Sequence, residues 1–322
     1  MYSDESIYQI RRGKNQMDVT ICLDVGGTFT KGMVFDETGK ELIEGINYYE
    51  SKASQTRKGI IKNFAGIIED LYKQVVNKNK LLTSIVLAFP GPFDYEEGIS
   101  LIKNLAKFDS LYQQNVKMAL EEEIKQHTFI DYSSTISIEI FNDAVAFAFG
   151  GYQIYRPTNN RGAYITIGTG CGSTFIEDER IIKDSKGIPE SGMIYKEPFK
   201  ESIIDDYISA RGVTNIIKEV YGSVISIEEV YKNALSNQEQ ALEVFHKFGQ
   251  NIELALYPYI ESFQPSEIVF GGQISKSFEF MKKGILEKLR MTNEPVKLRV
   301  SDNTSITTIR GLFKLKKEGR IY

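Results

Sequence analysis

The segment from residue 19 to residue 35 constrains the fold most, because an apolar strand, a glycine turn and a second strand follow one another in it. Residues 19–25 are mostly apolar, Gly26 and Gly27 form a turn signal, and residues 30–35 resume a strand pattern. This order predicts a β-hairpin. Two glycines let backbone N–H groups approach an anion closely, so the turn could bind phosphate without a lysine in the Walker position.

Asp24 stands at the end of the first strand, beside this glycine turn. A carboxylate next to a polyphosphate has the chemistry to hold Mg²⁺, directly or through water. A tight turn with an exposed aspartate would look the same in sequence, because Gly-Gly turns are common. The segment by itself leaves both interpretations open.

The opening pattern returns in residues 163–177, where a strand, a turn with alternating glycines and another strand follow one another. Two similar halves, each with a phosphate-binding hairpin, are therefore expected, and together they could hold successive phosphates of one nucleotide. A third strand, residues 268–271, runs into Gly271 and Gly272. These glycines would let a flat ring lie against the backbone, which suggests an adenine or ribose contact; an ordinary βα turn is the alternative.

Helical and strand periodicities alternate between and after these hairpins, which predicts an α/β fold with parallel strand pairs. In the first half we expect strands at 41–48, 84–89, 99–102 and 136–141, and helices at 56–76, 111–124 and 144–149. In the second half we expect helices at 201–210, 227–235, 239–263, 276–289 and 308–317, and a strand at 296–300.

Asp143 lies where a predicted strand gives way to a predicted helix, the usual position of a catalytic side chain in a doubly wound sheet. A helix N-cap is the alternative interpretation. The rigid turn Pro90-Gly91-Pro92 ends another strand, and a substrate could sit there, at the carboxyl end of the sheet.

Composition excludes several classes of protein. With 322 residues the chain is long enough for two domains, and its net charge of −4 argues against nucleic-acid or anionic-membrane binding. Two distant cysteines cannot form a disulfide framework, which favours a reducing compartment. No apolar run has the length of a membrane span or the character of a signal peptide, so we expect a cytoplasmic protein.

The order Asp-x-Gly-Gly-Thr, Pro-Gly-Pro, Asn-Asp, Gly-Thr-Gly-x-Gly, Gly-Gly resembles the actin-like ATPase superfamily of sugar kinases, and within it the ROK (repressor, ORF, kinase) family. This resemblance covers about residues 18–313. It implies a two-lobed, ribonuclease H-like α/β fold with a central cleft and mixed sheets flanked by helices. The expected domains are an N-terminal extension (1–17), a small lobe (18–153), a large lobe (154–306) and a C-terminal helix packed back on the small lobe (307–322).

The resemblance also implies roles for individual residues. Asp143 matches the general base, and Asn142, Asn104 and Gly91 match the sugar site, to which Glu190 and Asp205 are weaker matches. The nucleotide motifs match Asp24, Gly26, Gly27 and Thr28 for the first phosphate loop, Gly168, Thr169, Gly170 and Gly172 for the second, and Gly271 and Gly272 for adenosine.

Three departures from the family pattern stand out, and one is Asp205, which aligns with a sugar-binding glutamate of the family. The sugar motif Gly-Glu-x-Gly-His corresponds to residues 189–193, so Met193 replaces a histidine that would bind a sugar hydroxyl. The cysteine motif of the family's zinc site is missing, and no zinc site is expected. The sugar pocket should therefore differ from that of typical members, whereas the nucleotide loops match well.

The implied activity is an ATP-dependent and Mg²⁺-dependent sugar kinase. It would transfer the γ-phosphoryl group to a hydroxyl, commonly the 6-OH, of a hexose or a derivative of the glucose, N-acetylmannosamine, N-acetylglucosamine or β-glucoside type, and homodimers are the common family state. The main alternative is a degenerate, non-catalytic or regulatory family member that binds sugar or nucleotide. A DNA-binding repressor is disfavoured because only about 17 residues precede the first strand. Another kind of actin-like ATPase, such as an activator of an enzyme complex, is a further alternative, and it is disfavoured because this chain lacks the cluster-binding cysteines of such an activator.

Overall fold

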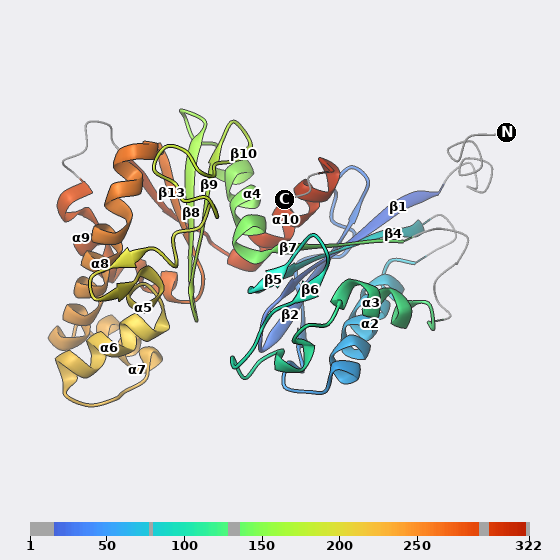
Figure 1. Ribbon diagram of the computed structural model, residues 1–322, viewed down its shortest axis with the longest axis horizontal. Coiled ribbons are helices and arrows are strands. Elements are labelled where there is room, and N and C mark those ends of the chain that lie inside the picture. Colours follow the sequence, from blue (N-terminus) through green and yellow to red (C-terminus); the bar gives the residue numbers. More distant parts are fainter. Residues whose placement is uncertain (1–15, 77–79, 128–135, 290–295, 320–322) are drawn as a thin grey trace. The chain divides into compact units, whose positions relative to one another are not determined.

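The computed structural model describes residues 16–76, 80–127, 136–289 and 296–319, and residues 1–15 of the expected N-terminal extension lie outside them. The chain divides into two compact units (Figure 1): unit 1 contains residues 1–146 and 308–322, and unit 2 contains residues 147–307. The chain enters unit 2 within helix α4 (Asp143–Tyr155) and returns to unit 1 within helix α10 (Thr304–Lys317). No helix in the described ranges is long and apolar enough to cross a membrane.

Unit 1 is built on a five-stranded mixed sheet with the order β3-β2-β1-β4-β7. Strand β1 (Met17–Val25) pairs antiparallel with β2 (Phe29–Asp36), which confirms the predicted hairpin. Strand β3 (Asn47–Glu50) extends the hairpin at its edge. On the other side, β4 (Lys80–Phe89) lies parallel to β1, and β7 (Ser137–Asn142) lies parallel to β4. The parallel pairs confirm the α/β class.

Helices α2 (Arg57–Lys73) and α3 (Val116–Ile124) pack side by side in unit 1 and cover one face of this sheet. Helix α2 buries the apolar positions that recur at helical spacing, and these residues form a core with the inward side chains of β1. On the opposite face, the ring of Phe313 in α10 packs on Phe35, with ring centroids 5.0 Å apart. The buried residues of α2 in this core are Ile60, Ile61, Phe64, Ala65, Ile67, Ile68, Leu71 and Tyr72.

Unit 2 repeats the same arrangement with the strand order β10-β9-β8-β13-β14. Strands β8 (Arg161–Ile167) and β9 (Cys171–Glu177) form an antiparallel hairpin, and β10 (Arg180–Ile181) continues it at the edge. Strand β13 (Glu267–Gly271) is parallel to β8 and to β14 (Lys297–Val300). The predicted second copy of the strand, turn and strand pattern is thereby confirmed.

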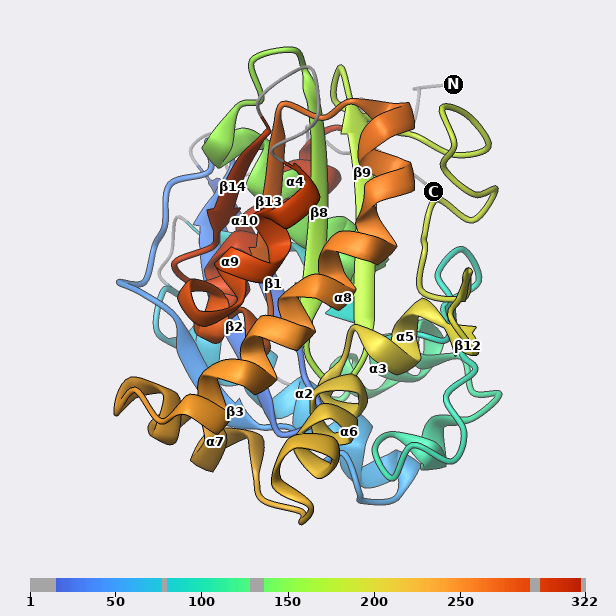
Figure 2. The same ribbon diagram turned by 90° about the vertical axis from the view of Figure 1, so that its left-hand side faces the viewer.

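Helices α8 (Glu239–Phe263) and α9 (Phe278–Leu289) cover one face of this second sheet (Figure 2), and α6 (Ala210–Tyr221) packs against α8. On the other face, Gly151 of α4 lies against the buried ring of Tyr164. The remaining short elements are β5 (Phe93–Asp94), β6 (Ile99–Ser100), η1 (Asp109–Leu111), β11 (Pro198–Phe199), β12 (Ser202–Ile203), α5 (Ile204–Tyr207), α7 (Ile227–Leu235) and η2 (Ile274–Ser277).

Several predicted elements were wrong in part: the helix expected at 111–124 begins at residue 116, and the strand expected at 99–102 ends at residue 100. A strand was expected at 41–48, and Asn47 and Tyr48 do pair with β2 as the start of β3. Before them, Glu41 forms an isolated bridge to β2 and the chain bends around Gly45 (φ +74°). A helix was expected over 201–210 with a stop near Gly212, yet α6 begins at residue 210 and contains this glycine. The reason is steric: a Cβ at Gly212 would lie 2.1 Å from the carbonyl oxygen of Tyr207, so the glycine permits a tight corner between α5 and α6.

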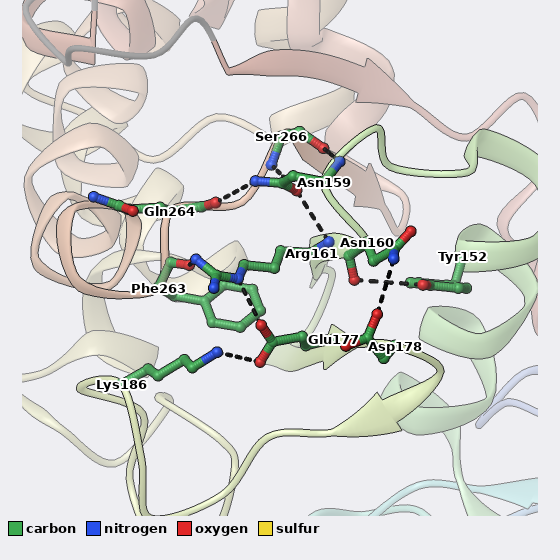
Figure 3. A network of polar contacts seen from close by, with 10 residues as sticks. All are labelled: Tyr152, Asn159, Asn160, Arg161, Glu177, Asp178, Lys186, Phe263, Gln264 and Ser266. Carbon is green, nitrogen blue, oxygen red and sulfur yellow. Dashed lines mark hydrogen bonds and ion pairs between the residues drawn. The ribbon is translucent and has the colours of Figure 1, made fainter.

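A polar network holds the end of the β8–β9 hairpin that is opposite the glycine turn (Figure 3). The Glu177 carboxylate pairs with Arg161 through Nε at 2.7 Å and with the Lys186 ammonium. The hydrogen bonds from Lys186 and Arg161 hold the pKa of Glu177 below its ordinary value. The side chain of Asn159 donates to the Gln264 carbonyl, which ties the start of β8 to the end of α8.

Helices α8 and α9 touch through their backbones. A Cβ added to Gly249 would lie 2.2 Å from the Met281 carbonyl oxygen, and one added to Gly284 would lie 2.4 Å from the His246 carbonyl oxygen. Both atoms belong to helix backbone, which cannot give way as the end of a flexible side chain can. Only glycine therefore fits at either position of this crossing.

We expect Gly284→Ala to lower the free energy of unfolding by about 2 kcal/mol or more, because the two helices must separate to admit the methyl group. Gly66→Ala is the matched control: Gly66 lies on α2 with nothing within 4 Å of an added Cβ, so alanine should stabilise its helix by about 0.5–1 kcal/mol. Urea denaturation followed by circular dichroism measures both. Equal midpoints for the two variants would contradict the backbone contact.

Candidate functional site

The turn after β1 leaves two backbone donors unused. The amide of Gly26 donates to the Phe29 carbonyl over 3.1 Å and closes the turn. Within the described part of the chain, no acceptor takes the amides of Gly27 and Thr28. Adjacent free amides at a tight turn form a site suited to an anion, as the glycine pattern predicted. Asp24, at the end of β1, pairs with Lys31 of β2 through an Nζ–Oδ2 distance of 3.2 Å.

Asp143 is the first residue of α4 and follows directly on β7. Burial, followed by the negative charge of Asp24, raises the pKa of its carboxyl to about 6, although the hydrogen bond from the Ala144 amide acts in the opposite direction. The group is therefore mainly ionised at neutral pH but is a stronger base than an exposed aspartate. Asp24 thus lies close enough to Asp143 for its negative charge to act on the Asp143 carboxyl.

The neighbour of Asp143 caps the helix. Asn142 Oδ1 accepts hydrogen bonds from the amides of Ala144 (3.0 Å) and Val145 (3.1 Å). Because Asn142 provides the cap, the simple N-cap interpretation does not account for Asp143, whose Oδ1 accepts from the amide of Ala144. Asn142 Nδ2 donates to the Tyr95 hydroxyl over 2.9 Å, and that hydroxyl donates to the Phe89 carbonyl at the end of β4.

Sequence reasoning missed Tyr95, which joins the Pro-Gly-Pro turn to the Asn-Asp motif. A Cβ at Gly91 would lie 3.4 Å from the Tyr95 hydroxyl and 4.0 Å from Asn142 Nδ2, so Gly91 stands beside both groups. A tyrosine four residues after this glycine carries no recognisable signal in a single sequence. Unit 1 therefore brings Gly91 to the same strand ends as Asn142 and Asp143, as expected.

Asn104 lies in an exposed loop and adopts a left-handed conformation (φ +61°). The Asp109 carboxylate accepts hydrogen bonds from the amides of Leu105 (3.0 Å) and Ala106 (3.1 Å), which fixes this loop. The loop reaches the β1–β2 turn, because the side chain of Lys107 lies directly against Gly27. Sequence reasoning missed this lysine too.

The glycine turn between β8 and β9 of unit 2 is fixed by hydrogen bonds to residues outside the hairpin. The amide of Ala210 donates to the Gly168 carbonyl over 2.8 Å, and the amide of Cys171 donates to Asp205 Oδ1 over 2.7 Å. No acceptor within the described ranges takes the amides of Thr169 and Gly170, so this turn also offers two adjacent donors. Asp205, predicted as a sugar ligand, has one carboxylate oxygen committed to this turn.

Gly271 and Gly272 are required by the protein's own packing. A Cβ at Gly271 would lie 2.6 Å from the Phe147 ring, and one at Gly272 (φ +90°) would lie 2.2 Å from the Ile167 carbonyl oxygen. The amide of Gly272 donates to Thr304 Oγ1 over 2.9 Å. These contacts explain the glycines without a bound ring, and the adenosine contact remains a prediction.

The segment that carries Glu190 and Met193 is a local turn. Ser191 Oγ accepts from the Met193 amide over 3.1 Å, and the Ile194 amide donates to the buried Ser173 hydroxyl of β9 over 3.0 Å. Glu190 is exposed and has no hydrogen-bond or ion-pair partner among the described residues. The segment is thus anchored beside β9 with a free carboxylate.

The donor set at Asp24 fits Mg²⁺. This ion binds through one or two carboxylates and keeps several waters and phosphate oxygens, so a single half-buried carboxylate beside free amides is sufficient. Across the described ranges, His, Cys, Asp and Glu side chains form no group of three or more that could hold a metal by themselves. Any metal here would therefore need further oxygen ligands from a substrate or from water.

The ROK family model matches residues 20–315. The chain belongs to the ROK family. Among its relatives, N-acetyl-D-glucosamine kinase of Haemophilus influenzae is 21% identical over 290 residues, which cover 83% of this chain and 88% of that protein.

Solved structures of ROK proteins share the fold. The ROK hexokinase from Thermus thermophilus has a TM-score of 0.71 at 15% identity and covers 94% of this chain and 100% of its own. The ROK family glucokinase from Streptomyces griseus, solved with glucose and AMPPNP, has a TM-score of 0.65 at 18% identity, with 92% and 98% covered. Two mixed five-stranded sheets flanked by helices therefore confirm the actin-like fold that the motifs predicted.

Proposed function

We propose that this protein is an ATP-dependent sugar kinase that phosphorylates a hydroxyl, by family resemblance the 6-OH, of a hexose or hexose derivative. The observation that carries the proposal is the half-buried Asp143 at the start of α4, whose carboxyl pKa is raised to about 6 by burial and by the nearby charge of Asp24. This is the environment that a general base requires. Relatives named as an N-acetyl-D-glucosamine kinase and a glucokinase support the same reaction class.

In the proposed mechanism, Asn104 and Asn142 bind acceptor hydroxyls, and Asp143 accepts the proton of the attacking hydroxyl as its oxygen approaches phosphorus in line. The amides of Gly27 and Thr28 donate to phosphate oxygens, and those of Thr169 and Gly170 offer the same donors in unit 2. Asp24 would hold Mg²⁺, directly or through water, and this ion supplies charge compensation for the phosphates when bound.

Two observations support a proposal for the acceptor class: the names of the relatives and the presence of Met193. An apolar side chain at this position cannot bind a sugar hydroxyl as histidine can, but it can contact an apolar substituent. An N-acetylhexosamine, whose acetamido group carries a methyl, fits this change, and an N-acetyl-D-glucosamine kinase is among the relatives. Glucose-type and β-glucoside acceptors belong in the same test.

A non-catalytic or regulatory ROK protein is the second candidate. The observation that favours it is Asp205, because a carboxylate bound to the Cys171 amide is withdrawn from the sugar. The retained pair of Asn142 and Asp143 favours the kinase. Activity against a panel of sugars decides between the two.

The panel experiment measures ADP release with Mg-ATP and hexoses, N-acetylhexosamines or β-glucosides. We expect one sugar to stimulate the wild-type protein, and Asp143→Asn to lower kcat about 10²- to 10⁴-fold, because an amide cannot accept the proton. Glu190→Gln, at an exposed position, is the comparison variant and should change the KM for sugar far more than kcat. No stimulation by any sugar, with measurable ATP binding, would favour the non-catalytic candidate.

The pH profile of kcat/KM should have an acid limb centred near pH 6, since Asp143 must be ionised to act and its pKa is raised to about 6. Activity is present above this pH and is lost as the pH falls through it. An ordinary aspartate would place the limb near pH 4. Circular dichroism over the same pH range separates titration from unfolding, and a limb near pH 4 in folded protein would contradict the role of Asp143.

Asp205→Ala tests which ligand this carboxylate serves. If it orients the Gly168–Gly172 turn through the Cys171 amide, alanine should raise the KM for ATP more than the KM for sugar. Asp205→Asn keeps an oxygen that can accept from the same amide and should retain most of the ATP affinity. A larger effect on the KM for sugar in both variants would show that Asp205 binds the acceptor instead.

A further inference from the structure

The side chain of Lys107 lies across the glycine turn after β1. The point that a Cβ would occupy at Gly27 is 2.1 Å from Lys107 Cδ, 3.0 Å from its Cε and 3.0 Å from its Nζ. At the adjacent Gly26, the corresponding point is 3.7 Å from Lys31 Nζ. Two ammonium groups therefore flank the turn that has free amides at Gly27 and Thr28.

The backbone on both sides of Lys107 is fixed. Asp109 accepts hydrogen bonds from Leu105 and Ala106 on one side. On the other side the Phe108 amide donates to the Ala53 carbonyl over 2.7 Å. The buried Phe108 ring packs on the Phe89 ring, with the ring centroids 5.1 Å apart. The fold of the loop therefore holds the backbone of Lys107 beside the turn, and the exposed side chain of this residue lies across Gly27.

The charges of the two lysines are balanced differently. Lys31 pairs with Asp24 at 3.2 Å. Lys107 has neither a hydrogen-bonded nor an ion-paired partner among the residues that the structure describes, although Asp24 and Asp143 belong to the same site. One cation and two free amides thus remain at the turn for an anion from outside the chain.

We infer that Lys107 binds the phosphoryl group that is transferred, the γ-phosphate of ATP, and this inference rests on the proposed kinase function. The lysine comes from the loop of Asn104, on the acceptor side, and its ammonium group reaches the turn on the donor side. It forms charge-assisted hydrogen bonds to the oxygens of the transferring group and takes part in no bond exchange. The acceptor oxygen forms a bond to the γ-phosphorus of ATP, the bond from this phosphorus to the bridging oxygen breaks and ADP leaves, and the hydroxyl proton passes to Asp143.

A purely steric role is the competing explanation, in which the stem of Lys107 covers Gly27. Lys107→Met separates the two, because methionine keeps an unbranched apolar stem and loses the ammonium group. Lys103→Met is the matched control: Lys103 lies in the same loop, but its Nζ stands over the Tyr112 ring, 5.1 Å from the centroid.

The experiment is calorimetric titration of the wild type and both variants with the non-hydrolysable analogue AMPPNP and with ADP, each with Mg²⁺ and without sugar. We expect Lys107→Met to lower the affinity for AMPPNP about tenfold or more and to change the affinity for ADP less than twofold, since only AMPPNP carries the third phosphate. Lys103→Met should change the affinity for neither nucleotide. Unchanged AMPPNP affinity in Lys107→Met, equal loss for both nucleotides, or no binding to the wild type would overturn the inference.

The experiments distinguish a failure of the proposed function from a failure of this inference. The predicted AMPPNP loss in a protein that phosphorylates no sugar would leave Lys107 as a γ-phosphate ligand and remove the kinase proposal. Conversely, an active kinase whose Lys107→Met variant binds AMPPNP normally and keeps the wild-type KM for ATP would keep the function and exclude this role for Lys107.

Discussion

The hydrogen bonds between Asn142 and the first amides of α4 fix the point at which β7 becomes a helix. Asp143 follows immediately, so the cap sets where its carboxyl lies, and burial at that point raises its pKa. The other groups of unit 1 lie around the same strand ends: the turn after β1, Gly91, and the loop that carries Lys107. Loss of the cap would therefore displace the acidic group on which the proposed chemistry depends.

Most of the fold could be predicted because its elements are long and strongly periodic. Helices α7 and α8 have the predicted bounds, and the two glycine hairpins were visible as a repeat. The prediction for residues 201–210 was wrong in part, because Gly212 forms the corner between α5 and α6 instead of ending a helix. Sequence patterns treat glycine as a helix stop, whereas here it allows α6 to begin against the Tyr207 carbonyl.

Residues of the candidate site could be predicted where they belong to a local sequence motif. Residues that join the site through contacts with distant parts of the sequence could not. Asp24 and Asp143 stand at strand ends, a position that periodicity reveals. Tyr95 and Lys107 act through contacts with Asn142 and Gly27, which the chain brings together only after folding. A motif match can also have a purely structural explanation. Gly271 matches the adenosine motif, but packing against Phe147 is by itself sufficient reason for a glycine there.

The hydrogen-bonding capacity of Asn142 gives the site a direction. A side-chain amide has two acceptor positions and two N–H donors. The amides of Ala144 and Val145 fill both acceptor positions, and Tyr95 takes one donor, so a single N–H remains for a ligand. The ionised carboxylate of Asp143 can only accept. A hydroxyl placed between these neighbours would accept from Asn142 and donate to Asp143. In the proposed mechanism, its proton would therefore point toward Asp143 before the phosphate is attacked.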